Sequence, residues 1–200
     1  MTSMRLGLMR HAETLWNREL RIQGQGESDL SPEGEAQALT WGKTLAGRGY
    51  TRLLASDLGR AVQTAQLINL TLKLPLDTDP RLREQDWGQW VGRTLPDLQT
   101  NSDGELQRQE AASWDFRPPR GENRKEVLAR ATAALSDAAR QYPEECILVV
   151  SHLGVVRCLL YDLLRLGFDP DAPNPVAKRA LHELEFSNGR FRILHLNLEL

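Results

Sequence analysis

The sequence has few cysteines, little net charge and no long hydrophobic run. Only two of its 200 residues are cysteines, and 25 basic side chains against 27 acidic ones leave a formal charge of −2. Two cysteines cannot build a four-thiolate zinc ribbon, and a near-neutral chain lacks the broad basic face that nucleic-acid binding needs. No apolar run approaches the roughly 18 residues of a membrane span, and none resembles an export signal. We therefore expect a cytoplasmic protein with no nucleic-acid or membrane partner.

The length and the hydrophobic content predict one domain over residues 1–200. A chain of 200 residues that is 40% hydrophobic can bury roughly 70% of the surface that its unfolded form exposes. Such a core needs neither a disulfide nor a structural metal. Cys146 and Cys158 are expected to be buried thiols, because cytosolic thiols stay reduced.

Short apolar runs alternate with helix-like segments along most of the chain. Buried strands are predicted at residues 6–9, 52–55 and 146–150. Helices are predicted at about residues 32–47, 56–72, 122–141 and 153–166. Ser31 is the expected N-cap of the first helix, and Ser56-Asp57 is expected to cap the second. A hairpin is predicted from residues 181–186 and 191–196 around Asn188-Gly189. This order predicts an α/β fold, a three-layer α/β/α sandwich with a mostly parallel sheet and helices on both faces.

Residues 77–122 interrupt this pattern with prolines and with tryptophans set among charges. We interpret this segment as an inserted lid with short helices at best. Trp87, Trp90 and Trp114 in this segment, like Trp16 before it, are either core residues or the floor of a substrate pocket.

Charged and imidazole side chains follow the predicted strands where each strand ends. Arg10 and His11 follow the first strand, Arg60 comes soon after the second, and His152 follows the strand at 146–150. The carboxyl ends of parallel strands open on one edge of a sheet, so these four residues are expected in one crevice. Two guanidinium forks and two imidazoles suit a tetrahedral dianion, which predicts a phosphate site.

The motifs that contain these residues follow a familiar order. Residues 8–17 are LMRHAETLWN, similar to an R-H-G-E-T-x-x-N signature. Residues 55–65 resemble S-x-L-x-R-A-x-x-T-A, residues 82–90 resemble L-x-E-x-x-x-G-x-W, and residues 149–157 resemble V-S-H-G-G-V-I-R. These are motifs of the histidine phosphatase superfamily, in its phosphoglycerate-mutase-like branch, and the resemblance spans residues 5 to about 165.

The resemblance implies a phosphoryl transfer in two steps. His11 would attack phosphorus as a neutral imidazole whose other nitrogen donates to a backbone carbonyl. Arg10, Arg60 and His152 would surround the phosphoryl oxygens. His152 would add positive charge there in its protonated form, and none in its neutral form. Glu84 would protonate the leaving oxygen and then activate the water that hydrolyses the phosphohistidine.

Further residues are expected at the substrate. Neutral contacts are assigned to Asn17, Gln23, Gly24 and Leu153. Leu153 stands where glycine is common in the motif, so it places a side chain beside the phosphate. Ala12 also replaces a glycine, which predicts that the backbone there does not adopt positive φ.

Other polar residues have alternative interpretations. Glu13 orients its loop, and it is the second choice for the acid if Glu84 proves remote. His182 and His195 are interpreted as structural. Asn123 replaces the serine of a G-E-S motif, which leaves the serine's role open. No cluster of carboxylates and histidines has metal-ligand spacing, so we expect a reaction without metal or other cofactor.

The leading functional hypothesis is a phosphomonoesterase that hydrolyses a small phosphorylated metabolite. The first alternative is a cofactor-dependent phosphoglycerate mutase, which usually carries longer insertions. The second is a non-catalytic phosphate-binding scaffold, which would be expected to have lost His11 or Glu84. The substrate stays open among phosphoserine, α-ribazole 5′-phosphate, sugar phosphates and a phosphoprotein. An exposed apolar strand edge in the predicted hairpin would permit a homodimer.

Overall fold

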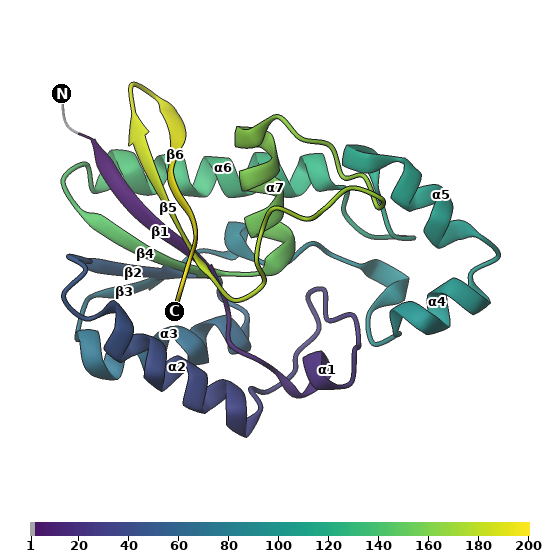
Figure 1. Cartoon of the computed structure of the whole chain (residues 1–200), viewed down its shortest axis with the longest axis horizontal. Helices are drawn as coiled ribbons and strands as arrows, with labels where there is room; N and C mark the ends of the chain where they lie inside the picture. The colour runs from purple at the N-terminus through teal and green to yellow at the C-terminus, as the bar shows by residue number, and fades with distance from the viewer. Residues whose placement is uncertain (1–2) are drawn as a thin grey trace.

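A computed structural model describes residues 3–200 and arranges six strands in one sheet in the order β3-β2-β4-β1-β5-β6 (Figure 1). The strands are β1 (Met4–Arg10), β2 (Arg52–Ala55), β3 (Leu76–Thr78), β4 (Cys146–Ser151), β5 (Leu181–Ser187) and β6 (Arg190–Leu198). The first four are parallel, whereas β5 runs antiparallel to β1 and β6 antiparallel to β5. The predicted mostly parallel sheet is confirmed.

Helices cover both faces of this sheet. They are α1 (Leu15–Arg18), α2 (Pro32–Leu45), α3 (Gly59–Leu72), α4 (Leu95–Asn101), α5 (Glu105–Ala111), α6 (Arg124–Gln141) and α7 (Leu153–Leu164). Helices α2 and α3 pack on one face, while α6 and α7 pack on the other (Figure 1). This is the predicted three-layer sandwich. In the part of the chain that is described, no helix is both long and apolar enough to span a bilayer.

The alternation of side chains along β1 explains how one strand serves both layers. Leu6 and Leu8 pack into the core under α6 and α7, and Met9 packs into the core under α2 and α3. Burial of each such side chain stabilises the fold by roughly 1.5–3 kcal/mol. Gly7 faces the hydroxyl of Tyr50, where a Cβ would lie 2.2 Å from the oxygen. A glycine inside this strand is therefore required by packing.

The start of the predicted lid was placed too early. Residues Leu76–Thr78 form β3, an edge strand parallel to β2. Two of its three residues are exposed, so it lacks the apolar pattern that marks a buried strand. The inserted segment begins after β3.

The inserted segment has a small core of its own. Two helices of seven residues, α4 and α5, and three 3₁₀ turns make up its regular structure, as predicted. Trp90, Leu98, Leu106 and Phe116 of this segment form a buried cluster with Ile22, which comes from the loop after α1. Trp114 instead packs edge-on against Phe168 beside the main core. In Figure 1 this segment extends away from the sheet at the end opposite the N-terminus.

Helix termini agree with the sequence signals except at α3. Ser31 caps α2, and Asn123 caps α6 in a capping box with Glu126, which gives the residue in the serine position a structural role. Helix α3, however, begins at Gly59 without a side-chain cap. The two residues expected to cap it are engaged elsewhere, Ser56 with His152 and Asp57 with Arg83.

The C-terminal hairpin turns at Asn188 and Gly189, which both have positive φ, as a two-residue hairpin turn of this sequence requires. Its outer strand β6 forms an edge of the sheet, but Phe191, Ile193 and Leu196 pack against the core. The hairpin thus presents a strand edge, as expected, with its apolar side chains partly buried against the core, and the homodimer stays a prediction. Cys146 and Cys158 are free thiols; Cys158 is buried as predicted, whereas Cys146, at the start of β4, is only partly buried.

Candidate active site

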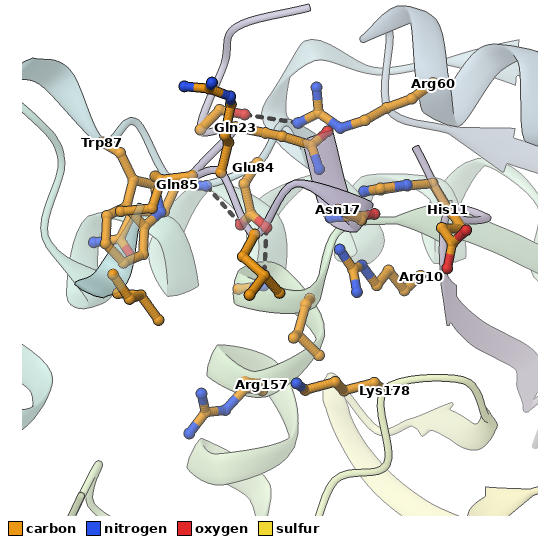
Figure 2. A pocket seen from close by; sticks show the side chains of 18 of the residues that line it. Arg10, His11, Asn17, Gln23, Arg60, Glu84, Gln85, Trp87, Arg157 and Lys178 are labelled. Carbon is orange, nitrogen blue, oxygen red and sulfur yellow. Dashed lines mark hydrogen bonds between the residues drawn. The ribbon is translucent and has the colours of Figure 1, made fainter. Parts of the chain in front are cut away.

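A cavity of about 620 Å³ lies where β1 ends and α7 begins. Eight of the nine predicted site residues line it: Arg10, His11, Asn17, Gln23, Gly24, Arg60, Glu84 and Leu153. Those labelled in Figure 2, among them His11, Arg60 and Glu84, come from segments far apart in the sequence. The structure therefore brings the segments that follow β1, β2 and β4 to one site, as their positions predict, and adds Glu84 from the segment after β3.

His11 lies at the bottom of this cavity and is only 4% exposed. Its Nδ1 lies 2.7 Å from the carbonyl oxygen of Ala12. Since a carbonyl only accepts, Nδ1 carries the proton and Nε2 keeps its lone pair. Burial, reinforced by the charges of Arg10 and Arg60, holds the pKa of His11 well below its usual range. The imidazole is thus neutral and available as a nucleophile.

The loop that carries His11 is fixed by Thr64 of α3. The N–H of Ala12 donates to Thr64 Oγ1 at 3.1 Å, and the Thr64 hydroxyl donates to the carbonyl of Arg60 at 2.7 Å. Ala12 is absent from the residues with positive φ, as predicted. Thr64 was not among the predicted site residues, although the threonine of the T-A motif could have indicated it.

Arg60 is almost completely buried and is held by backbone carbonyls. Its two terminal nitrogens donate to the carbonyls of Gly26 and Gly24, both at 2.7 Å. Gly24 has positive φ and closes this turn. Arg60 Nε is buried without a hydrogen-bond partner among the described residues. Burial lowers the pKa of Arg60, but an arginine stays protonated. Gly24 thus contributes a carbonyl that orients Arg60, a contact that the sequence did not predict.

Arg10 is the second cation at this end of the cavity. Its Nε is buried and has no hydrogen-bond partner within residues 3–200. Burial is the main cause that lowers the pKa of Arg10, and the charge of Glu84 opposes the shift. A partly buried guanidinium with an unpaired donor is a preformed contact for an anion.

Glu84 faces these cations from the segment after β3 (Figure 2). Its Oε1 accepts from the N–H of Gln85 at 2.8 Å, and its Oε2 accepts from the N–H of Gly154 at 3.2 Å. A Cβ on Gly154 would lie 2.2 Å from Oε1, so only glycine allows this approach. The first turn of α7 therefore fixes the carboxyl group inside the cavity.

The backbone of Glu84 is positioned by Arg130 of α6. Arg130 donates to the carbonyls of Arg81, Arg83 and Glu84 at 2.7, 2.6 and 3.0 Å. The same guanidinium forms a bidentate ion pair with Glu122, in which Nε and Nη2 donate to the two carboxylate oxygens at 2.7 and 2.8 Å. Arg130 is a positioning residue that lies outside the predicted motifs.

His152 is the predicted site residue that does not line the cavity. Its ring centroid lies 5.2 Å from that of His11, and the residue is fully buried. His152 Nε2 is 2.8 Å from Ser56 Oγ, and its Nδ1 has no hydrogen-bond partner among the described residues. Burial and Arg60 hold the pKa of His152 well below its usual range. The imidazole is neutral, so the positive charge beside His11 comes from Arg10 and Arg60.

The remaining predicted contacts are in place but partly engaged. Asn17 Oδ1 accepts from the N–H of Thr14 in the capping box of α1, which leaves its amide N–H groups free. Gln23 is buried, and its Oε1 has no partner in the described part of the chain. Glu13 accepts from Ser31 Oγ and pairs with Arg179, so it holds its loop.

His182 and His195 lie outside the cavity. His182 is buried in the sheet, and its Nδ1 accepts from the N–H of Asn197 at 3.2 Å. His195 is exposed and pairs with Glu183. Both positions agree with the structural interpretation. Trp87, by contrast, lines the cavity.

The sequence profile of the histidine phosphatase superfamily (branch 1) matches residues 6–199. The chain belongs to this superfamily. Among curated superfamily relatives, a probable phosphoglycerate mutase, GpmB of Enterobacter sp. (strain 638), is 38% identical over 159 residues, which cover 80% of this chain and 74% of the relative.

Solved structures of similar proteins agree with the fold. YhfR of Bacillus stearothermophilus superposes with a TM-score of 0.86 at 27% identity, covering 98% of each chain. A mycobacterial glucosyl-3-phosphoglycerate phosphatase in complex with VO3 gives a TM-score of 0.84 at 27% identity, covering 98% of this chain and 99% of that one. The superfamily relatives thus include a named phosphatase and a probable mutase.

Proposed function

We propose that this protein is a phosphomonoesterase that hydrolyses a small phosphate ester through a phosphohistidine on His11. One observation carries the proposal. The neutral, buried imidazole of His11 shares a cavity with two arginines and with a carboxyl group held by the first turn of α7. These are a nucleophile, cations for the phosphoryl oxygens and a proton donor, the parts that phosphoryl transfer to an imidazole needs.

In the first step, His11 Nε2 attacks phosphorus in line with the ester oxygen. The P–N bond forms as the P–O bond breaks, and Glu84 in its acid form gives its proton to the leaving oxygen. The Nδ1–H bond to Ala12 persists throughout and stabilises the positive charge that develops on the ring.

In the second step, water attacks the phosphohistidine. Glu84, now a carboxylate, takes a proton from this water as its oxygen bonds to phosphorus and the P–N bond breaks. Inorganic phosphate leaves, His11 is neutral again, and Glu84 has regained its proton.

The charge on the phosphoryl oxygens is held by Arg10 and Arg60. Carbonyls of Gly24 and Gly26 fix Arg60 before substrate binds, so little reorganisation is needed. Removal of one such donor typically costs about 10²- to 10³-fold in rate. Asn17 adds a neutral N–H donor. The ring of His152 packs beside that of His11 and does not line the cavity.

The proposal is tested by release of inorganic phosphate from a panel of phosphomonoesters in the presence of a chelator. We expect hydrolysis by the wild type without added metal and none above background by His11→Asn. Equal hydrolysis by His11→Asn would contradict the nucleophile. Loss of wild-type activity on chelation would contradict the metal-independent reaction. Absence of hydrolysis across the panel would favour a non-catalytic phosphate-binding protein.

A phosphoglycerate mutase is the second candidate, because a probable mutase is among the relatives with 38% identity. Such an enzyme would interconvert 2- and 3-phosphoglycerate with a bisphosphate primer and release little phosphate. The two reactions are separated by measuring phosphate release and isomerisation in the same sample. Isomerisation without phosphate release would replace the phosphatase by the mutase.

A further inference from the structure

Most arginines of this chain are either exposed or paired with a carboxylate. Within residues 3–200, four are at least partly buried and form no ion pair: Arg10, Arg60, Arg124 and Arg157. All four line the same cavity. Arg10 and Arg60 are accounted for by the phosphoryl group. Arg124 and Arg157 are left without an assigned counter-ion, although burying unpaired charge is costly.

Arg157 projects from α7 one turn beyond Gly154, the residue that holds Glu84. Arg157 donates to the hydroxyl of Tyr161 at 3.1 Å, and this hydroxyl donates to Asn174 Oδ1 at 3.0 Å. The guanidinium is therefore oriented before any ligand arrives. Its Nε is buried and has no hydrogen-bond partner among the described residues. A buried and unpaired donor beside a cavity indicates a missing acceptor.

Arg124 and Arg157 share a neighbour, the ring of Phe168. The Cζ of Arg124 is 4.0 Å and that of Arg157 is 5.2 Å from the centroid of Phe168. Arg124 also donates to the carbonyl of Ser113 at 2.8 Å. Burial lowers the pKa of Arg124 to about 10, and the like charge of Arg157 adds to the shift. Both side chains are cationic at neutral pH, and an anion between them would relieve their repulsion.

The charge balance of the cavity points the same way. Seven arginine or lysine side chains line it against two carboxylates, Glu13 and Glu84, in a chain whose net charge is −2. Glu13 is already paired with Arg179, and Glu84 is held by backbone N–H groups. Figure 2 places Arg157 and Lys178 on the side of the cavity opposite Arg60. Neither carboxylate neutralises the cations on that side.

We propose that Arg157 and Arg124 form a second anion subsite, so that the substrate is a phosphate ester whose alcohol part carries a carboxylate or a second phosphate. Because Glu84 meets the leaving oxygen, the alcohol part extends past Glu84 toward Arg157 on the next turn of α7. The planar guanidinium groups bind such an anion through bidentate hydrogen bonds, and Lys178 adds positive charge at the rim of the cavity. This inference rests on the proposed function only for the phosphoryl end of the ligand.

Matched pairs of esters test the subsite. 3-Phosphoglycerate and glycerol 3-phosphate differ only in a terminal carboxylate against a hydroxymethyl group, and so do 6-phosphogluconate and glucitol 6-phosphate. Glucitol 1,6-bisphosphate tests a second phosphate. In at least one comparison we expect kcat/KM for the ester with a second anionic group to exceed that for the ester with a hydroxymethyl group in its place by about 10- to 100-fold, as expected for a hydrogen-bonded charge. The preferred partner distinguishes carboxylate from phosphate.

Substitutions then assign the preference to this subsite. Arg157→Gln should reduce the ratio to about 3 or less, and Arg124→Gln should reduce it independently. Lys43→Gln removes one exposed charge from α2 outside the cavity and should keep the wild-type ratio. Wild-type ratios below about 3 for every comparison, or a ratio that survives both arginine substitutions in folded protein, would overturn the subsite.

Binding separates this inference from the proposed function. Calorimetric titration of His11→Ala with the same esters should show the same preference in Kd, and the added Arg157→Gln should abolish it. A preference in Kd without hydrolysis by the wild type would overturn the phosphatase and keep the subsite. Hydrolysis with equal Kd values and equal kcat/KM values would do the reverse.

Discussion

The carboxyl group of Glu84 lies so close to the backbone of Gly154 that a side chain at position 154 would collide with it. The N–H of Gly154 donates to Glu84 Oε2 at 3.2 Å, while a Cβ at this position would lie 2.2 Å from Oε1. The proposed proton donor is therefore placed by the absence of a side chain on a neighbouring helix. This contact makes the site sensitive to a change of one methyl group.

Gly154→Ala should displace Glu84 and impair proton donation to the leaving group. We expect kcat/KM for alkyl phosphates to fall by about 10²- to 10⁴-fold, the usual contribution of a general acid. 4-Nitrophenyl phosphate should lose much less, because its leaving group needs no proton. Equal losses for both substrates, with an unchanged unfolding temperature, would contradict this role of the contact.

Ser56 should fix the tautomer of His152. The hydroxyl oxygen of Ser56 accepts from the N–H of Leu58 at 3.3 Å. The hydroxyl group lies 2.8 Å from His152 Nε2, and this nitrogen is the only acceptor for its proton among the described contacts. Nitrogen-15 NMR should therefore find the proton of His152 on Nδ1 in the wild type, and a mixture of tautomers in Ser56→Ala. A proton on Nε2 of the wild-type ring would show the opposite arrangement.

Arg130→Met should lower both stability and activity. Methionine donates to none of the three carbonyls and leaves the carboxylate of Glu122 without its cation, and removing one partner of a largely buried ion pair costs about 3 kcal/mol. Urea denaturation measures the first effect and kcat the second. The double variant Arg130→Met/Glu122→Leu removes the unpaired charge, so it should recover stability relative to Arg130→Met without recovering kcat. Recovery of kcat in this double variant would show that the carbonyl contacts do not position Glu84.

The stability of the fold should fall on mild acidification, in part through His182. Burial lowers the pKa of His182 to about 4 from its ordinary 6.5. Between these values the unfolded chain takes up a proton that the folded chain excludes, so this stability is fully present above pH 6.5 and is lost as the pH falls toward 4.

His182→Gln should flatten the dependence of the unfolding free energy on pH by up to one proton in this window, about 1.4 kcal/mol per pH unit. Urea denaturation from pH 7 to pH 4 measures the slope. His195→Gln, in the same hairpin, controls for the loss of a histidine from these strands. An unaltered slope in His182→Gln would contradict a depressed pKa.

Local sequence signals predicted the part of the site that follows strand ends. The apolar runs before Arg10 and His152 mark β1 and β4, and parallel strands bring the residues after them to one edge. The glycine of the hairpin turn and the serine cap of α2 are equally local, because the chemistry of one or two residues decides each.

Features that depend on packing between distant segments were not predicted. Arg124 and Arg157 meet only because α6 and α7 both pack beside Phe168. The burial of His152 behind His11 depends on Ser56, nearly a hundred positions away in the sequence. Strand β3 has three residues and no apolar alternation, so only its pairing with β2 defines it.

The phosphoryl group is expected to be transferred to His11 before it reaches water, and a rapid-quench experiment tests this step most directly. Wild-type protein mixed with a ³²P-labelled ester should form a labelled species within one turnover that is stable to alkali and labile to acid, with the label on the peptide that contains His11. The label should decay at a rate no slower than kcat. Steady hydrolysis without any labelled protein, or label on another residue, would contradict the account.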